Sequence, residues 1–308
     1  MQVLVLGNGA HTKKRIVPAL KKIPFIESIL VADRNARKVN KMDDVLSIVN
    51  YQEVFKLSIN FDLAIIATPP NNHIESLKKI NGKSRNILIE KPISNNINVI
   101  RSNEFKAIYE NGSVFESIMY FHHPLWKKVQ TIVNDIDIKE IYTEFSVPHQ
   151  SLDGFRYKKK MGGGSLNDQG IYPISLITEL FSQNYDVKSI QIFKDKDYEV
   201  DLGGKLNLSI KNINVFSQWG LGKDYKNYLI IKDTADNEYK FDFIFSKPDN
   251  LNAKIIFSNN KEIKVGVYDQ FELMYRAILE SNVSEFKYSK YDNLFRRYNL
   301  LKEVSNFF

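Results

Sequence analysis

Four mainly apolar runs near the N-terminus alternate with helical patterns. The runs are Gln2–Leu6, Ser28–Ala32, Leu63–Ala67 and Asn86–Ile89. The third run is almost wholly apolar, as expected for a parallel strand that is covered on both faces. Apolar residues at helical spacing follow the first and third runs, at Ile16, Ala19, Leu20, Ile74, Leu77 and Ile80. This alternation predicts an α/β fold with a doubly wound sheet over residues 1–118.

The pattern changes in the second half of the chain. A strand is expected over Val114–Phe121 and helices over Leu125–Val133, Tyr268–Glu280 and Lys290–Phe307. From Glu140 onward, short β-rich runs are separated by turn residues, as in an antiparallel sheet. These runs are Ile141–Val147, Val187–Phe193, Lys205–Ile210, Ile213–Trp219, Tyr228–Lys232, Tyr239–Phe243, Lys254–Phe257 and Lys261–Val265. We expect residues 119–308 to form a second α/β domain with a large, mostly antiparallel open sheet, and its final helices can pack back on the first domain.

A glycine-rich block, Gly162–Ile174, lies between the first two of these β-rich runs. Its three leading glycines allow backbone angles that other residues avoid, and let the chain approach a ligand closely. We expect Ser165 or Asn167 to cap a helix whose apolar residues face inward. Asp168 and Tyr172 stand four residues apart and therefore share a helix face. They form either an acid/base pair or a buried tyrosine whose hydroxyl is bound by the carboxylate.

A second glycine-rich turn follows the first apolar run as Gly7-Asn8-Gly9-Ala10-His11-Thr12. A strand, a glycine turn and a helix in this order place a pyrophosphate against backbone amides at the helix N-terminus. Thr12 occupies the third position of the G-x-G-x-x-G pattern, which weakens the motif.

Asp33 ends the second apolar run about where a dinucleotide fold places the acid that binds the adenosine ribose, roughly 20 residues past the glycines. A carboxylate here favours NAD because it would repel a 2′-phosphate. Arg34 can meet that phosphate or stack on adenine, so NADP stays open. The alternative is that Asp33 is a turn residue at a strand end.

Two further polar loops follow apolar runs, and an open α/β sheet binds its ligand at the carboxyl ends of its strands. The loops are Thr68-Pro69-Pro70-Asn71-Asn72-His73 and Glu90-Lys91-Pro92. Lys91 is either a solvated surface charge or a donor to a substrate oxygen that also favours a nearby phenolate.

Composition and charge narrow the class of protein. The chain has 308 residues, 43% hydrophobic and 26% charged, with no cysteine, which excludes disulfides and thiolate metal sites. No apolar segment approaches membrane-spanning length and the N-terminus leads directly into a glycine turn, so we expect a cytoplasmic protein with no membrane partner.

The net charge of +7 comes mostly from scattered lysines. Clusters at Lys13–Arg15 and Lys158–Lys160 suit bound phosphates; a nucleic-acid partner is the rival, but no nucleic-acid motif accompanies them, so none is predicted.

The adjacent His122 and His123 raise the question of a metal site. Neighbours on an extended chain point to opposite sides, and no H-E-x-x-H pattern is present. We therefore predict no metal and assign His123 to the substrate pocket.

Together these motifs resemble the glucose-fructose oxidoreductase, inositol dehydrogenase and rhizopine catabolism family, called Gfo/Idh/MocA, over nearly the whole chain. The matching segments are the glycine turn with Arg15-Ile16-x-Pro18-Ala19, Ala67-Thr68-Pro69-Pro70 with His73, Glu90-Lys91-Pro92, the Gly162–Gly170 block and the final helices. The resemblance implies an N-terminal Rossmann domain that holds NAD(H) or NADP(H). It also implies a substrate domain whose open sheet forms the oligomer contact, giving a homodimer or homotetramer.

The resemblance also implies site residues. Lys91 and Asp168 match the family's catalytic positions, whereas Tyr172 stands where a histidine is common. A tyrosine there is similar to the subgroup of nucleotide-linked keto-sugar reductases, in which it donates the proton. The cofactor-binding set is Gly7, Asn8, Gly9, Ala10, His11, Asp33, Arg34, Thr68, Pro69, Pro70, His73, Glu90 and Lys91. The substrate-binding set is His123, Arg156, Asp168, Tyr172 and Tyr225.

The expected function is reduction of a ketone on a nucleotide-activated sugar, with NAD(H) favoured and NADP(H) possible. One alternative is a dehydrogenase of a free sugar or cyclitol, and another is a non-catalytic NAD(P)-binding regulator. The leading hypothesis requires Lys91 and Tyr172, from separate domains, to converge beside the nicotinamide.

Overall fold

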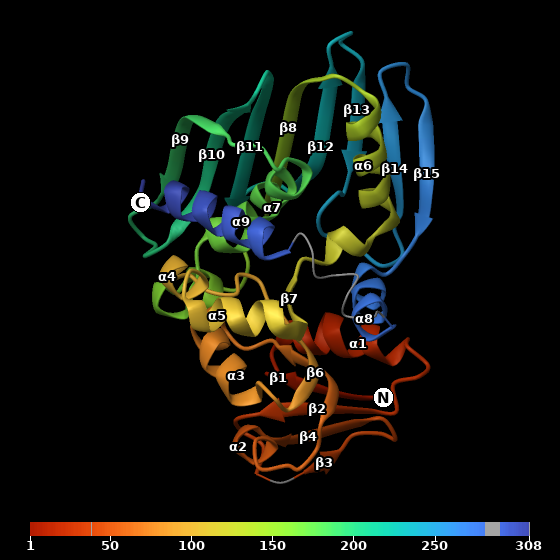
Figure 1. Ribbon diagram of the computed structural model, residues 1–308, viewed down its shortest axis with the longest axis vertical. Helices are drawn as coiled ribbons and strands as arrows, with labels where there is room; N and C mark the ends of the chain where they lie inside the picture. The colour runs from red at the N-terminus through yellow and green to blue at the C-terminus, as the bar shows by residue number, and fades with distance from the viewer. Residues whose placement is uncertain (38, 281–289, 308) are drawn as a thin grey trace. The chain divides into compact units, whose positions relative to one another are not determined.

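The computed structural model describes residues 1–37, 39–280 and 290–307 and divides into two compact units (Figure 1). The first unit comprises Met1–Ile118 and Phe271–Tyr291, and the second comprises Met119–Gln270 and Asp292–Phe308. The predicted second domain also included residues 281–289 and 308, which lie outside the described residues.

The first unit is built on a mostly parallel sheet. In the described chain this sheet has seven strands in the order β3-β4-β2-β1-β5-β6-β7. The strands are β1 (Gln2–Leu6), β2 (Ser28–Asp33), β3 (Asn40–Lys41), β4 (Leu46–Asn50), β5 (Phe61–Ile66), β6 (Ser84–Glu90) and β7 (Val114–Ser117). Every neighbouring pair is parallel except β3 and β4. The central strands are buried on both faces, which confirms the predicted Rossmann arrangement.

Short helices connect these strands. They are a π-helical turn at Thr12–Ile16, α1 (Val17–Lys21), α2 (Tyr51–Val54), α3 (His73–Ile80), α4 (Ile97–Ile100), α5 (Asn103–Ile108) and a second π-helical turn at Tyr109–Ser113. The chain returns to this unit through α8 (Gln270–Glu280), where the Ile278 carbonyl accepts a hydrogen bond of 3.3 Å from Asn86 Nδ2 on β6. The final part of the chain therefore contributes to both units.

The second unit is built on a mostly antiparallel sheet, as predicted. Over the described residues it has eight strands in the order β15-β14-β13-β12-β8-β11-β10-β9, with β8 and β11 parallel. The strands are β8 (Ile138–Val147), β9 (Asp186–Lys194), β10 (Asp201–Ile210), β11 (Ile213–Leu221), β12 (Lys226–Asp233), β13 (Glu238–Asp242), β14 (Asn252–Phe257) and β15 (Glu262–Val267). Figure 1 shows α6 (Pro124–Asp135), α7 (Ile171–Leu180) and α9 (Lys290–Ser305) against one face of this sheet.

One sequence-based expectation about local structure is wrong, and two strands were missed. The strand expected over Val114–Phe121 ends at Ser117, and Met119–His122 forms a 3-10 turn that leads into α6. Its apolar residues pack into the core of the second unit, where Met119 and Tyr120 are buried, so their hydrophobicity does not indicate a strand. The strands β3 and β4 were not predicted, because β3 is exposed and β4 is only partly buried and shows no clear alternation.

Within the described ranges, none of the helices combines the length and the apolar character that crossing a membrane requires.

Candidate active site

The first glycine turn is fixed by a close approach of two backbone segments. Gly7 has a φ of +118°, and a Cβ at this position would lie 2.7 Å from the Ala67 carbonyl oxygen at the end of β5. The Gly7 amide donates to the Ala32 carbonyl on β2 at 3.1 Å. Because β1 lies between β2 and β5, this turn stands at the carboxyl ends of three parallel strands. That is the place where an open α/β sheet binds its ligand.

Thr12 explains how the turn closes without a third glycine. Its side chain is 1% exposed, and its hydroxyl donates to the Gly7 carbonyl at 2.7 Å. No side chain of the described residues caps the helix that begins here. A Cβ placed on Gly9 would meet no described atom within 4 Å. The first amides of this helix are therefore accessible to an anion such as a pyrophosphate.

Asp33 connects the end of β2 to the same turn. One carboxylate oxygen accepts from Asn8 Nδ2 at 2.9 Å, and the other accepts from the Asn35 amide at 2.8 Å. These hydrogen bonds, from Asn35 first and Asn8 second, lower the pKa of Asp33. The residue therefore is a turn residue at the strand end, and it also presents an ionised carboxylate beside the glycine turn. Arg34, the next residue in the chain, and Ala10, within the glycine turn, are both exposed.

His73 ties together the two loops that follow β5 and β6. Its side chain is 0% exposed, its Nε2 lies 2.7 Å from the Thr68 carbonyl oxygen, and its Nδ1 lies 2.9 Å from the Pro92 carbonyl oxygen. Burial lowers the pKa of His73. The imidazole therefore positions the loops that carry Thr68, Pro69, Pro70 and Lys91 and is itself sealed from solvent.

Thr68 gives a further sign that this loop faces a ligand. Its Oγ1 is buried and has no hydrogen-bond partner among the residues described. A buried hydroxyl is nearly always hydrogen-bonded in a native protein, to the protein itself, to water or to a bound molecule. Together with the space beside Gly9 and the ionised Asp33, this hydroxyl fits a bound dinucleotide.

Glu90 and His11 meet within the first unit. Glu90 Oε1 lies 3.2 Å from His11 Nε2 and accepts a hydrogen bond of 3.0 Å from the Ser117 hydroxyl. Burial alone would raise the pKa of Glu90, but His11, Lys91 and Ser117 outweigh it and the pKa is lowered. The ring of His11 also packs edge-on against Phe271 at 5.5 Å between centroids. The contacts at this strand end thus hold Glu90 as an anion next to Lys91 in the chain.

The second glycine-rich block is fixed by a carboxylate. Gly164 has a φ of +112°, and a Cβ there would lie 2.3 Å from Asp201 Oδ1. Neither Ser165 nor Asn167 caps the helix, which corrects the prediction. The Ser165 hydroxyl instead donates to Asp201 Oδ2 at 2.5 Å, and Asn167 Nδ2 donates back to the Gly162 carbonyl at 3.3 Å. The helix begins with a π-helical turn, Leu166–Gly170, that runs into α7.

This helix is buried on all sides and not only on one face. Every residue from Ile171 to Thr178 is buried, including the Ser175 and Thr178 hydroxyls, which bond to carbonyls one turn back. The side chain of Trp219 on β11 lies beneath Gly170, where a Cβ would approach it to 3.1 Å. The expectation that the apolar residues of this helix face inward is therefore confirmed, and its small polar residues are buried with them.

Asp168 is held in an ion pair with a second predicted substrate residue. Its Oδ2 accepts from Arg156 Nε at 2.5 Å and from Gln169 Nε2 at 2.7 Å. The charge of Asp168 raises the pKa of Arg156. Asp168 is 7% exposed and largely shielded from water, whereas the Arg156 side chain is 36% exposed. The structure thus brings Arg156 and Asp168 together, and their pairing favours Asp168 as a fixed carboxylate.

Tyr172 projects from the same helix into an aromatic cluster. Its ring lies 4.9 Å from Phe145 in a T-shaped arrangement and 5.7 Å from Phe245, and the side chain is 5% exposed. Its hydroxyl donates to the Met119 thioether at 3.5 Å, and a thioether is a weak acceptor. The ring of Tyr172 is held by aromatic contacts, and its hydroxyl bonds to a weak acceptor. This arrangement suits donation of the phenolic proton to a stronger acceptor. Sequence reasoning did not include Phe145 and Met119, because their place beside Tyr172 depends on tertiary packing.

The other two predicted substrate residues lie in different environments. His123 is 2% exposed and caps α6, because its Nδ1 accepts from the Leu125 amide at 3.0 Å. Tyr225 is 43% exposed, and its hydroxyl donates to the Ser246 carbonyl at 3.0 Å. His123 is therefore first a helix cap, whereas Tyr225 is accessible to a ligand.

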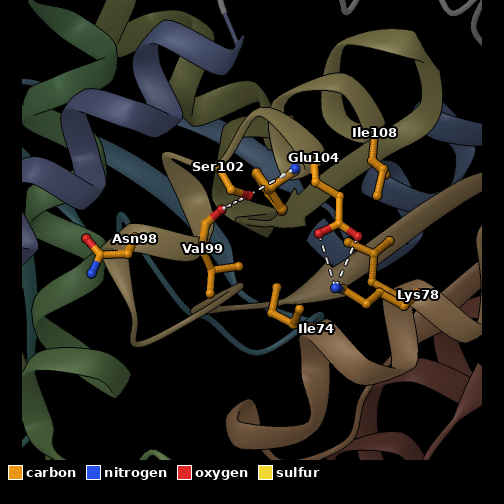
Figure 2. A pocket seen from close by; sticks show the side chains of 9 residues that line it. Ile74, Lys78, Asn98, Val99, Ser102, Glu104 and Ile108 are labelled. Atoms are coloured by element: carbon orange, nitrogen blue, oxygen red, sulfur yellow. Dashed lines mark hydrogen bonds and ion pairs between the residues drawn. The ribbon is translucent and has the colours of Figure 1, made fainter.

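A cavity of about 270 Å³ in the first unit is separate from these residues (Figure 2). It lies between α3 and the segment of α4 and α5, and an ion pair between Lys78 and Glu104, 3.1 Å long, crosses its edge. Its lining is Ile74, Leu77, Lys78, Asn98, Val99, Ser102, Glu104, Phe105 and Ile108. None of the predicted site residues lines this cavity.

Among the residues that the structure describes, no three His, Asp or Glu side chains lie close enough together to form a metal-ligand set.

Comparisons with known proteins agree with this architecture. Residues 1–115 match a family model, GFO_IDH_MocA, described as "Oxidoreductase family, NAD-binding Rossmann fold". The chain is 24% identical over 232 residues to a dTDP-3,4-didehydro-2,6-dideoxy-alpha-D-glucose 3-reductase of Streptomyces violaceoruber, covering 73% of this chain and 67% of the relative. It is 21% identical over 295 residues to the enzyme of the same name from Actinomadura kijaniata, covering 92% and 88%.

A solved structure is similar over the full length. The crystal structure of KijD10, a 3-ketoreductase from Actinomadura kijaniata in complex with NADP and TDP-benzene, superposes with a TM-score of 0.86 at 19% identity. The match covers 99% of this chain and 97% of that chain. At this identity the likeness establishes the shared fold. KijD10 holds NADP, so this relative gives no support to the predicted preference for NAD(H).

Proposed function

Because residues 1–115 match the model of the Gfo/Idh/MocA oxidoreductase family, described as an NAD-binding Rossmann fold, we propose that this chain is a member of that family and reduces a ketone on a nucleotide-activated sugar. The observation that carries the proposal is Tyr172, which follows the ion-paired Asp168 on the helix of the glycine block. The relatives named as dTDP-keto-sugar 3-reductases, which align with up to 92% of the chain, support the substrate class.

The residues of the first unit would hold the cofactor. The amides after Gly7 would bind the pyrophosphate, the Asp33 carboxylate would accept from a ribose hydroxyl, and the Thr68 hydroxyl would gain a partner that it lacks among the described residues. When bound, the reduced nicotinamide supplies the hydride that the reaction requires.

Oligomerisation through the open face of the second sheet stays a prediction.

The residues of the second unit would supply the proton. Tyr172 would donate its phenolic proton to the ketone oxygen, so that the ketone becomes a secondary alcohol once its carbon has taken up a hydride, and the phenolate would be reprotonated from solvent. Lys91 would assist by a hydrogen bond to the ketone oxygen and would favour the phenolate by its charge. The contact with Arg156 holds the Asp168 carboxyl group in place, where it would accept a hydrogen bond from a sugar hydroxyl. The convergence of Lys91 with Tyr172 remains a prediction.

Substrate and cofactor can be tested together. The purified protein is mixed with NADPH or NADH and a dTDP-linked 3-keto-deoxysugar, and oxidation of the nicotinamide is followed by absorbance. We expect turnover with the nucleotide-linked ketone and much slower turnover with the free keto-sugar. The same protein with NAD⁺ or NADP⁺ and free sugars or cyclitols serves as the comparison, and a preference for these substrates would contradict the proposal.

The role of Tyr172 is tested by Tyr172→Phe, which removes the proton donor and keeps the ring in its aromatic cluster. We expect kcat to fall by about 10²- to 10⁴-fold, the usual contribution of a positioned proton donor. NAD(P)H affinity, measured by fluorescence titration, should be unchanged. Tyr120→Phe is the matched control, because it removes a neighbouring buried hydroxyl that bonds to Ser175 at 2.9 Å. Turnover that survives Tyr172→Phe would assign the proton to another group.

A further inference from the structure

We infer that Asp201 is a positioning residue for the proposed reduction: its carboxylate fixes the start of the helix that carries Asp168 and Tyr172. The residue lies on β10, a different element from the glycine block. The inference rests on the proposed function, and it adds a residue that contacts neither the nicotinamide nor the ketone in the mechanism above.

The contacts of Asp201 converge on the first residues of the helix. Its Oδ2 accepts from the Ser165 hydroxyl at 2.5 Å and from the Leu166 amide at 2.7 Å. Its Oδ1 occupies the space that a side chain on Gly164 would need. The carboxylate is 7% exposed, so these bonds are made in a largely dry environment. Asp201 therefore takes the role that an N-cap residue plays in an ordinary helix, but it does so from a distant strand.

The glycine block transmits this position to the catalytic groups. The Gly164 amide donates to the Arg156 carbonyl at 2.8 Å, and the Arg156 side chain binds Asp168. Leu166 opens the π-helical turn that contains Asp168 and continues into α7 with Tyr172. A shift of the block would consequently move the carboxylate, its arginine partner and the phenol together.

The charge of Asp201 suits this position. A carboxylate at a helix N-terminus interacts favourably with the positive end of the helix dipole. Burial raises the pKa of Asp201, and the hydrogen bonds from Ser165 and Leu166 oppose that rise. Ionising the buried Asp201 side chain has a cost in free energy, and the hydrogen bonds that it accepts fix the geometry of the helix start.

The test compares two variants of Asp201. Asp201→Leu keeps the branching at the γ carbon but is larger and accepts no hydrogen bond, whereas Asp201→Asn keeps the size and an acceptor oxygen. We expect Asp201→Leu to lower kcat by about 10- to 100-fold, because a small displacement of catalytic groups has effects of this size. Asp201→Asn should recover turnover to within about threefold of the wild type, the range of one weakened hydrogen bond. NAD(P)H dissociation constants should be the same in all three proteins.

Asp233 on β12 provides a matched control. It is also 7% exposed, and it accepts from the Ala235 and Asn237 amides, each at 2.9 Å, in a hairpin that contains none of the predicted site residues. Asp233→Leu should lower the melting temperature without the loss in kcat. Equal kcat losses in Asp201→Leu and Asp233→Leu would show a general structural effect and overturn the inference.

A double-mutant cycle separates positioning from folding. Because Asp201 acts through both Asp168 and Tyr172, Asp201→Leu should change the residual turnover of the double variant Asp168→Asn, Tyr172→Phe by less than about threefold, since groups that act as a unit are not additive. Losses that multiply would overturn the inference, and so would a wild-type kcat in a folded Asp201→Leu.

If Asp201→Leu does not fold, Ser165→Ala is the second test. It removes one hydrogen-bond donor to Asp201 and should lower kcat about threefold. An unchanged kcat in Ser165→Ala would equally overturn the inference. A wild-type protein inactive on all sugar nucleotides would instead refute the proposed function.

Discussion

The two glycine-rich turns share one local design and differ in what stands at the helix start. Gly7 and Gly164 have φ values of +118° and +112°, and each leads into a π-helical turn followed by an α-helix. Within the described chain, neither helix has a side-chain N-cap hydrogen bond from its own N-terminal residue. At the first turn, the position of Gly9 faces open space; at the second, the Asp201 carboxylate is hydrogen-bonded to the helix start.

This difference separates a binding turn from a positioning turn. The uncapped amides of a helix N-terminus attract an anion, and the first turn leaves them for a phosphate. At the second turn a buried carboxylate already satisfies the Leu166 amide, so a phosphate there would meet a like charge. Glycines at a helix start therefore indicate a close approach of the backbone, and the neighbouring group decides whether an anion can bind.

The largest effect is expected from adding a methyl group to each turn. Gly7→Ala would place Cβ against the Ala67 carbonyl, and Gly164→Ala would place it against Asp201 Oδ1. Both also force alanine into a positive φ, at a cost of about 1–3 kcal/mol of stability. We expect Gly7→Ala to weaken NAD(P)H binding by about 10²-fold or more, since the turn must widen and each 1.4 kcal/mol is tenfold. Gly164→Ala should spare NAD(P)H affinity and lower kcat.

Fluorescence titration of NAD(P)H, together with kcat at saturating cofactor, distinguishes the two variants. Gly82→Ala is a suitable control, because Gly82 also has a positive φ, of +80°, but no described atom lies within 4 Å of its added Cβ. It should show the strain cost in the melting temperature with unaltered binding and turnover. If Gly164→Ala lost cofactor affinity as Gly7→Ala does, the distinction between the two turns would be wrong.

A smaller effect is expected from making the first turn resemble the second. Gly9→Asp would add a carboxylate at the open helix start, where Gly9 has room for a side chain. Repulsion between this carboxylate and the pyrophosphate should weaken NAD(P)H binding about tenfold at low salt. A tenfold loss lies in the upper part of the range of effects that a charge has at a helix terminus. Gly9→Asn has the same shape without the charge and should lose less. The gap between the two variants should narrow in 0.5 M salt, and a gap that did not respond to salt would point to a steric cause.

Much of the first unit could be predicted from the sequence because its signals are local. The buried runs such as Leu63–Ala67 are apolar on both faces, and the glycine turn directly follows one of them. The position of Asp33 at the end of the next strand followed from the same spacing, and in the structure its carboxylate accepts a hydrogen bond from Asn8. Thr12 was counted against the motif, although its hydroxyl closes the turn. A hydrogen bond from a side chain to a turn carbonyl is not visible in a glycine pattern.

The second unit shows what local patterns miss. The cap expected from Ser165 is supplied by Asp201, which is remote in the sequence and becomes a neighbour only when β10 packs beside the helix. The pairing of Arg156 with Asp168 and the packing of Phe145 on Tyr172 also depend on tertiary contacts. Sequence reasoning found Asp168 and Tyr172 because they share a helix face, and it could not identify the groups that fix that helix.

The smallest expected effect concerns the two acids that flank these turns, whose pKa values shift in opposite directions. Hydrogen bonds from Asn35 and Asn8 lower the pKa of Asp33, whereas burial raises that of Asp201, each relative to an ordinary 3.8. Above pH 3.8 the native state therefore retains a proton on Asp201 that the unfolded state has lost, so this residue makes stability fall as pH rises through its folded pKa. Asp33 has the opposite effect: its contribution to stability is lost as pH falls below 3.8.

Melting temperatures measured from pH 3 to 8 test this. Asp201→Asn should reduce, by a few degrees, the fall in melting temperature as pH rises. Asp33→Asn should reduce the fall in melting temperature at acid pH by less, because Asp33 is the more exposed. Curves for Asp201→Asn and the wild type that stayed parallel above pH 4 would mean that ionising this carboxylate costs the fold nothing, and that its hydrogen bonds fully compensate its burial.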